Sequence, residues 1–320
     1  MNTTQSSTQA VEAPPANQSA GAELTAGAKL TALAWGIILI VSIPQIILRL
    51  FVPAATGEAN TPLWLALTQV VVLAVLWART WVWPAMKPLR GFILALLALF
   101  VGMFLIYPIM VKSAAWANWV GQGSWGVSLV VSMLMVHLFP VVLMALTLIG
   151  SGIGRRELFL VCGNPNASAQ PSRLLFMKKA EPWTRVALKF LPVYIIIAVS
   201  ILWIQLRPDL SQISQALIYL PAILIAAAIN ASAEEFEFRS MPLARLLPVL
   251  GKQQPIMITA VLWGFLHYFG NPGGLPGVLL VWYLGNIFAK SMIETRGFVW
   301  AFLIHLVGDT IIYAFWAMSV

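Results

Sequence analysis

Residues 213–246 read ISQALIYLPAILIAAAINASAEEFEFRSMPLARL, and this stretch decides which class of protein the chain forms. Its apolar run, Ala222 to Ala231, continues almost directly into four charged residues: Glu234, Glu235, Glu237 and Arg239. The apolar part is typical of a helix in a lipid bilayer. A charge at the centre of such a helix costs on the order of 2.5 to 3.5 kcal/mol, so a cluster there indicates function. The alternative is that the membrane ends at Ser232 and the charges form a solvated helix end.

The composition of the whole chain agrees with a membrane protein. Of its 320 residues, 60% are hydrophobic and 9% are charged, whereas soluble proteins average about 45–50% and about 25%. This difference excludes an ordinary soluble domain and a disordered chain. The single cysteine, Cys162, excludes a disulfide scaffold and a cysteine-rich metal site.

The chain is predicted to consist of a polar tail and one membrane domain. Residues 1–28 are rich in Ser, Thr, Gln, Asn and Ala and carry only Glu12 and Glu23 as charged side chains. Such a segment buries too little apolar surface to offset its ordering entropy, so we predict that it is disordered. Residues 29–320 are predicted to form a membrane helical domain, and its motif-bearing core starts near residue 185.

Nine apolar stretches follow Lys29, and most are near the roughly 20 residues that cross the hydrocarbon as a helix. They are approximately Leu30–Leu50, Pro62–Trp83, Gly91–Val111, Val127–Gly150, Val186–Leu206, Ile213–Leu246, Pro255–Phe269, Pro276–Ile293 and Phe298–Ser319. The seventh and eighth are short and are separated by the turn residues 271–274. The sequence therefore predicts an all-α, polytopic membrane helix bundle with about nine transmembrane helices, or eight if a short stretch is re-entrant.

The basic residues predict how the bundle is oriented. If the N-terminus is cytoplasmic, sixteen Lys and Arg residues fall on the inner side, and three, Arg49, Lys112 and Arg207, fall outside. This bias predicts a cytoplasmic N-terminus and an outside C-terminus, in the plasma (inner) membrane. It explains the net charge of +8 by contact with a lipid bilayer, without nucleic acid. The basic connection 151–183 is interpreted as a loop facing lipid headgroups, with substrate docking as the alternative.

Polar residues on two later stretches are predicted to reach the depth of the glutamates. At about 1.5 Å per residue, His267 lies about 18 Å from the cytoplasmic start of its helix, His305 about 10 Å and Asp309 about 16 Å. Glu234 lies about 18 Å from the inner end of its own helix. A solvated helix end would not explain this convergence, so we expect a polar site inside the bundle.

Helical spacing suggests how these groups pair. Glu235 and Arg239 are four residues apart, which favours an ion pair within the helix. Glu234 points about 100° away and is left to act as a base. His305 and Asp309 have the same four-residue spacing, so Asp309 can orient the ring or accept its proton. His137 stands alone and is interpreted as a buried packing histidine.

Two chemistries fit such a set of residues. In one, Glu234 deprotonates a water that attacks a peptide carbonyl while another polar group stabilises the oxyanion. In the other, Glu234, His267 and His305 bind a divalent metal that polarises the water. The chain has no HExxH motif, which is the usual helical zinc signature.

Three motifs in order resemble one family. Residues 234–239 match EExxxR, residues 263–267 match FxxxH with Trp263 in place of Phe, and residues 305–309 match HxxxN/D. This set, which covers roughly residues 213–319, resembles the CPBP family of intramembrane proteases. That family includes the CAAX prenyl endopeptidase type and the bacterial Abi-type proteins linked to bacteriocin processing and self-immunity.

The resemblance implies an intramembrane endopeptidase that acts on a membrane-tethered or hydrophobic peptide without a metal or other cofactor. It implies that Glu234 activates the water with His267 and that His305 and Asp309 stabilise the oxyanion. It gives Glu235 and Arg239 supporting roles. Asp309 can donate a hydrogen bond to an oxyanion only when protonated, and otherwise its expected role is to orient His305.

Two other functions use the same residues. A non-catalytic scaffold or immunity-type partner would retain the motifs for structure. A proton-coupled transporter would use membrane Glu, His and Asp side chains as a relay. The transporter is disfavoured because the hydropathy pattern shows no internal repeat.

Overall fold

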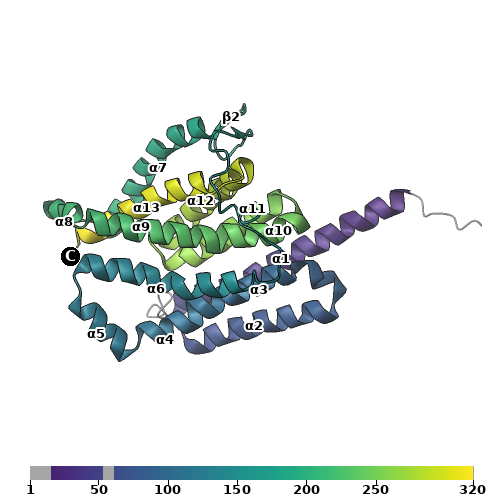
Figure 1. Ribbon diagram of the computed structural model, residues 1–320, viewed down its shortest axis with the longest axis horizontal. Helices are drawn as coiled ribbons and strands as arrows, with labels where there is room; N and C mark the ends of the chain where they lie inside the picture. The colour runs from purple at the N-terminus through teal and green to yellow at the C-terminus, as the bar shows by residue number, and fades with distance from the viewer. Residues whose placement is uncertain (1–15, 53–60, 320) are drawn as a thin grey trace, which may run out of the picture.

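The computed structural model describes residues 16–52 and 61–319 and consists almost entirely of helices (Figure 1). The first half contains α1 (Ala16–Phe51), α2 (Leu63–Val82), η2 (Pro84–Leu89), α3 (Arg90–Phe100), η3 (Val101–Ile106), α4 (Tyr107–Val111), α5 (Ala114–Gln122) and α6 (Trp125–Leu146). After a loop come α7 (Trp183–Leu206), η4 (Leu210–Gln212), α8 (Ile213–Ile218), α9 (Leu220–Glu235), η5 (Phe236–Ser240) and α10 (Met241–Leu250). The last elements are α11 (Gln253–Leu266), η6 (His267–Phe269), α12 (Gly274–Thr295) and α13 (Val299–Ala317).

The predicted class, a polytopic helical membrane bundle, is confirmed. Among the described residues, seven helices are long and apolar enough to cross a membrane, or eight if the bent pair 210–218 and 220–250 is one span. The predicted number was eight to nine. The difference lies in α11, whose 14 residues rise only about 21 Å, less than the roughly 30 Å of hydrocarbon.

The predicted tail is described only in part. Residues 1–15 lie outside the described residues, so the prediction of disorder remains untested for them. Helix α1 begins at Ala16, twelve residues before the predicted boundary at residue 28. The boundary between tail and helix therefore falls inside the polar segment.

Two spans form the centre of the bundle. In the spans 84–111 and 274–295, 61% of the most apolar 18-residue stretch is buried inside the protein. The corresponding share is 22% in both α6 and α7. The apolar surface of α6 and α7 therefore faces outward, where lipid would cover it. Figure 1 shows α7 along one side of the bundle and α2 along the other.

The helices run between two distinct ends of the bundle. At one end, which we call the loop end, Arg245 Nη2 donates to Thr147 O at 3.0 Å and Asn164 N donates to Thr295 O at 2.8 Å. At the other end, Gln205 Nε2 donates to Gly273 O at 3.1 Å. The segments predicted to be cytoplasmic meet at the loop end, so the charge bias and the fold agree on which segments share a side.

Helix α11 and the residues after it connect these two ends. The helix follows α10 at the loop end, and it leads through η6 to Gly273, which lies at the opposite end. The short α11 thereby ends deep inside the bundle, and the first residue after it is His267.

The loop between α6 and α7 is ordered by backbone pairing. Strand β1 (Ser168–Ala169) pairs antiparallel with β2 (Glu181–Pro182), and an isolated bridge joins Ser172 to Met177. Phe298 N also donates to Val161 O at 2.9 Å. These bonds hold the loop against the start of α13.

We predict that the loop end is cytoplasmic, and Cys162 provides the test. It is the single cysteine of the chain and is exposed at the loop end. A membrane-impermeant maleimide should therefore leave it unlabelled in intact cells and label it in inside-out vesicles.

A second position gives the matched control. In the Cys162→Ser/Ser214→Cys variant the thiol lies in exposed α8, at the opposite end. This variant should show the reverse labelling. Labelling of Cys162 in intact cells would mean that the bundle is inverted.

Candidate active site

Helices α9, α11 and α13 bring the predicted site residues together, with the turn of π-helix η5 beside them. Glu234 and Glu235 are the last two residues of α9, and Arg239 lies in η5. His267 directly follows α11, and His305 and Asp309 lie one turn apart on α13. π-Helical turns inside α-helices often mark functional sites. The sequence motifs do not predict this turn.

Glu235, His305 and Arg239 form the buried centre of the cluster. Glu235 Oε1 lies 2.8 Å from His305 Nδ1 and 3.4 Å from Arg239 Nη2. The side chains of Glu235 and Arg239 are both 0% exposed. The predicted ion pair of Glu235 and Arg239 is thus present, and Glu235 also orients the His305 ring.

Two aromatic rings cover the Arg239 guanidinium. Its Cζ lies 3.5 Å from the centroid of the Trp263 ring and 5.4 Å from that of Phe288. None of its side-chain nitrogens has a hydrogen-bond partner among the described residues. Cation–π contacts of this kind are stronger when they are desolvated. The rings and Glu235 together replace the water that this cation loses.

Glu234 has different neighbours from Glu235. Its Oε2 accepts a hydrogen bond from Trp263 Nε1 at 2.7 Å and lies 3.7 Å from His305 Nε2. Its side chain is 13% exposed. Trp263 stands where the motif has Phe, and its indole N–H holds the carboxylate.

His267 presents one ring nitrogen to the backbone. Its Nδ1 lies 3.3 Å from Trp263 O. A carbonyl only accepts, so Nδ1 carries the proton in this contact. The His267 ring centroid lies 5.0 Å from that of Trp263.

A second polar chain reaches the site from α6. Asn230 Nδ2 donates to Asp309 Oδ2 at 3.0 Å, and Asn230 Oδ1 lies 2.9 Å from His137 Nε2. On its other side, His137 Nδ1 lies 3.1 Å from Glu237 Oε1. Asp309 Oδ1 lies 3.5 Å from His305 Nε2. His137 is buried, as expected, but it is connected to the site through Asn230.

Some of these groups line a cavity of about 240 Å³. Its polar lining includes His137, Asn230, Glu234, His267 and Asp309. The space is sufficient for several water molecules. Two carboxylates, two imidazoles and an amide therefore face one small compartment.

A metal site is the alternative use of these side chains. Among the described residues, no group of three His, Cys, Asp or Glu side chains is placed to hold a metal ion. In addition, Glu235 already contacts His305 Nδ1, so only Nε2 of that ring faces Glu234 and Asp309.

Sequence reasoning missed Asn230 and the connection of His137 to the site. Asn230 lies four residues before Glu234, on the same helix face, and this spacing was a usable signal. The link between His137 and Asn230 spans 93 residues. No local pattern predicts such a contact, because it depends on how α6 packs against α9.

The fold and the site together define a polytopic membrane protein with a buried Glu, His and Asp centre. Residues 216–311, which include all six predicted site residues, match the family model described as type II CAAX prenyl endopeptidase Rce1-like. The match confirms the resemblance to CPBP-family intramembrane proteases that the three motifs indicated. No curated protein and no solved structure matches the chain significantly.

Breaking the buried ion pair should destabilise the protein. Arg239→Gln leaves the buried Glu235 without its cation, and such a loss typically costs about 3–5 kcal/mol. We expect a marked fall in the thermal unfolding temperature of the detergent-solubilised protein. The exposed Arg156→Gln serves as the control and should leave that temperature unchanged.

A double variant separates charge from packing. Glu235→Gln/Arg239→Gln removes both charges and should unfold at a higher temperature than Arg239→Gln alone. Equal unfolding temperatures would show that Arg239 acts through its packing on Trp263 and Phe288, and would contradict the role given to the ion pair.

Proposed function

We propose that the cavity at Glu234 is the active site of an endopeptidase that hydrolyses a peptide bond in a membrane-tethered or hydrophobic peptide. The observation that carries this proposal is the position of Glu234. It faces the cavity beside His267 and is held by the Trp263 N–H. In contrast, Asp309, the other carboxylate that lines the cavity, is bound by Asn230, and Glu235 is completely buried. The family match supports intramembrane proteolysis in general.

In the proposed mechanism, Glu234 is the general base. A water in the cavity lies between the Glu234 carboxylate and Nε2 of His267, and Glu234 takes one of its protons as the oxygen attacks the peptide carbonyl carbon. The Trp263 N–H holds one oxygen of Glu234, which leaves the other oxygen for the water. Glu234 then delivers the proton to the leaving amine, so that water adds OH to the acyl group and H to the nitrogen.

We assign to His305 the stabilisation of the oxyanion. Glu235 holds its Nδ1, and Nε2 points toward the gap between Glu234 and Asp309. As an imidazolium, His305 would donate from Nε2 to the developing negative charge. Asp309 accepts from Asn230, so we assign it the second of its two expected roles, which is to position His305.

The surroundings of the site support a hydrophobic substrate. An apolar groove of about 600 Å³ lies between α6 and α9 on the outer surface, and its lining includes Ser232, Ala233 and His137. His137 also lines the catalytic cavity. A peptide that entered from the lipid would pass mostly apolar side chains before it reached the polar centre.

Glu234→Gln should reduce proteolysis at least about 100-fold, because the amide keeps the shape of the side chain but cannot act as a base. Comparative proteomics of membranes from wild-type and variant cells should show accumulation of an uncleaved membrane peptide. Expression and thermal stability should remain close to wild type.

Glu157→Gln is the matched control for this experiment. Glu157 is an exposed carboxylate that accepts a hydrogen bond from Gly154 N in the loop, and its replacement should leave the peptide profile unchanged. If Glu234→Gln cells cleaved the same peptides at the wild-type rate, the chain would be a non-catalytic partner.

A metal-free mechanism makes a separate prediction. Treatment of the purified protein with phenanthroline should leave activity largely intact, because a glutamate base and an imidazolium require no Lewis acid. Elemental analysis should find well below one metal per chain. Stoichiometric zinc, with activity lost on chelation and restored by added zinc, would instead make Glu234, His267 and His305 metal ligands.

A further inference from the structure

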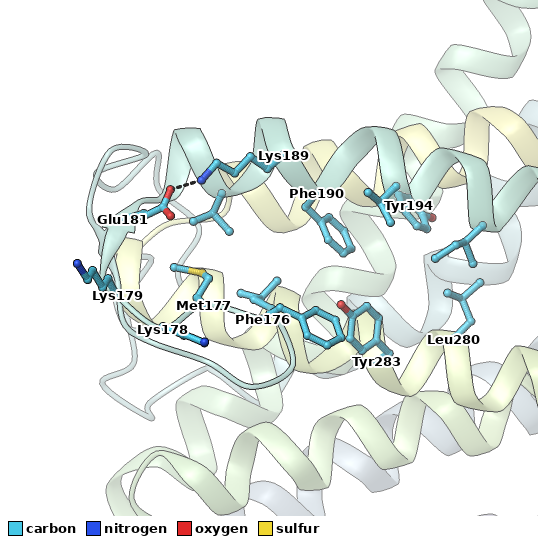
Figure 2. A pocket seen from close by; sticks show the side chains of 14 residues that line it. Phe176, Met177, Lys178, Lys179, Glu181, Lys189, Phe190, Tyr194, Leu280 and Tyr283 are labelled. Carbon is cyan, nitrogen blue, oxygen red and sulfur yellow. Dashed lines mark hydrogen bonds and ion pairs between the residues drawn. The ribbon is translucent and has the colours of Figure 1, made fainter.

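A second cavity, of about 690 Å³, lies between α7, α12 and the loop that precedes α7 (Figure 2). We call it the α7–α12 groove. Its walls share no residue with the catalytic cavity. It begins at the loop end of the bundle and extends along the span of α7, from Val186 to Ile197.

The walls of the groove are apolar and extended. Figure 2 shows Phe190 and Tyr194 of α7 on one side and Phe176, Tyr283 and Leu280 on the other. From Val186 to Ile197 the wall is about 16 Å long. The one polar group of Tyr283 is already used, since its hydroxyl donates to Leu174 O at 2.8 Å. Such a slot suits a hydrocarbon chain.

The mouth of the groove carries uncompensated positive charge. Lys178, Lys179 and Lys189 line it together with Glu181. Lys189 donates to Glu181 at 2.6 Å and holds the pKa of that carboxyl below its usual range. Lys178 and Lys179 are exposed, and neither forms an ion pair within the described part of the chain.

The loop that forms the mouth is built and held in place. The bridge between Ser172 and Met177 closes it, and Tyr283 fastens it to α12. At its tip Phe176 is 90% exposed and has a φ of 52°, a backbone conformation that is uncommon for a large residue. An exposed aromatic ring beside two lysines is typical of a surface that contacts lipid.

We propose that the α7–α12 groove binds one anionic phospholipid, with its phosphate at Lys178 and Lys179 and an acyl chain between α7 and α12. Charge complementarity and the outward-facing span of α7 favour this occupant. An acidic peptide fits less well, because its backbone N–H and C=O groups would lose water without gaining partners on apolar walls. This site is independent of the proposed protease activity.

Native mass spectrometry of the full chain tests the proposal. The protein is released from detergent micelles that contain equal amounts of phosphatidylglycerol and phosphatidylcholine with identical acyl chains. We expect one phosphatidylglycerol to be retained in preference to phosphatidylcholine. The Lys178→Gln/Lys179→Gln variant should bind phosphatidylglycerol about tenfold more weakly. Glycerol phosphate, which has the headgroup phosphate without the chains, should not compete.

Two further variants give the controls. Arg155→Gln/Arg156→Gln removes an adjacent exposed pair of cations from the same loop, outside the groove, and should keep the preference. Val193→Trp fills the slot at an exposed position of α7 and should reduce retention of both lipids. It keeps the proposal testable if the lysine variant fails to fold.

Three outcomes would overturn the proposal. The first is equal retention of the two lipids by the wild type. The second is an equal loss of phosphatidylglycerol in both double variants, which would mean that the overall positive charge of the loop attracts the lipid and that the groove has no specific site. The third is unchanged lipid retention in Lys178→Gln/Lys179→Gln together with slower peptide cleavage, which would make the groove a substrate site.

Discussion

The burial of Glu235 and Arg239 inside a membrane bundle is the constraint on which the rest of the site depends. Either charge alone would cost several kcal/mol at this depth. The protein meets the constraint with a direct contact between the two residues, two aromatic rings over the guanidinium and the His305 ring on the carboxylate. Because the contacts to Glu235 come from η5 and from α13, the same interaction links α9 to both elements.

This constraint gives two neighbouring glutamates different properties. Successive residues of an α-helix point about 100° apart, so Glu235 faces α13 while Glu234 faces α11 and the cavity. The first is completely buried, and the second keeps access to a space that holds water. A carboxylate locked between an arginine and an imidazole is a poor base, whereas one held by a single indole N–H keeps an oxygen for water.

The sequence was sufficient for the class of fold and for the members of the cluster, because both depend on local patterns. Hydropathy predicted the helices, and spacing predicted the pairs 235–239 and 305–309, which the structure contains at 3.4 and 3.5 Å. What could not be predicted depends on packing between distant helices. The partner of His305 Nδ1 is Glu235 rather than Asp309, and the Trp263 indole reaches Glu234. The predicted stretch 255–269 covers α11 and η6, and α11 alone is too short to count as a full span.

The outer layer of the site explains how an aspartate is accommodated at position 309, where the motif also allows asparagine. An isolated carboxylate here would face Glu234 across the cavity in a region of low dielectric. Asn230 supplies an amide N–H to Asp309, and its own orientation is set because its carbonyl faces His137. His137 is in turn held by Glu237. Glu237 belongs to the charged cluster of the sequence but has no place in the family motif. It supports Asp309 through His137 and Asn230.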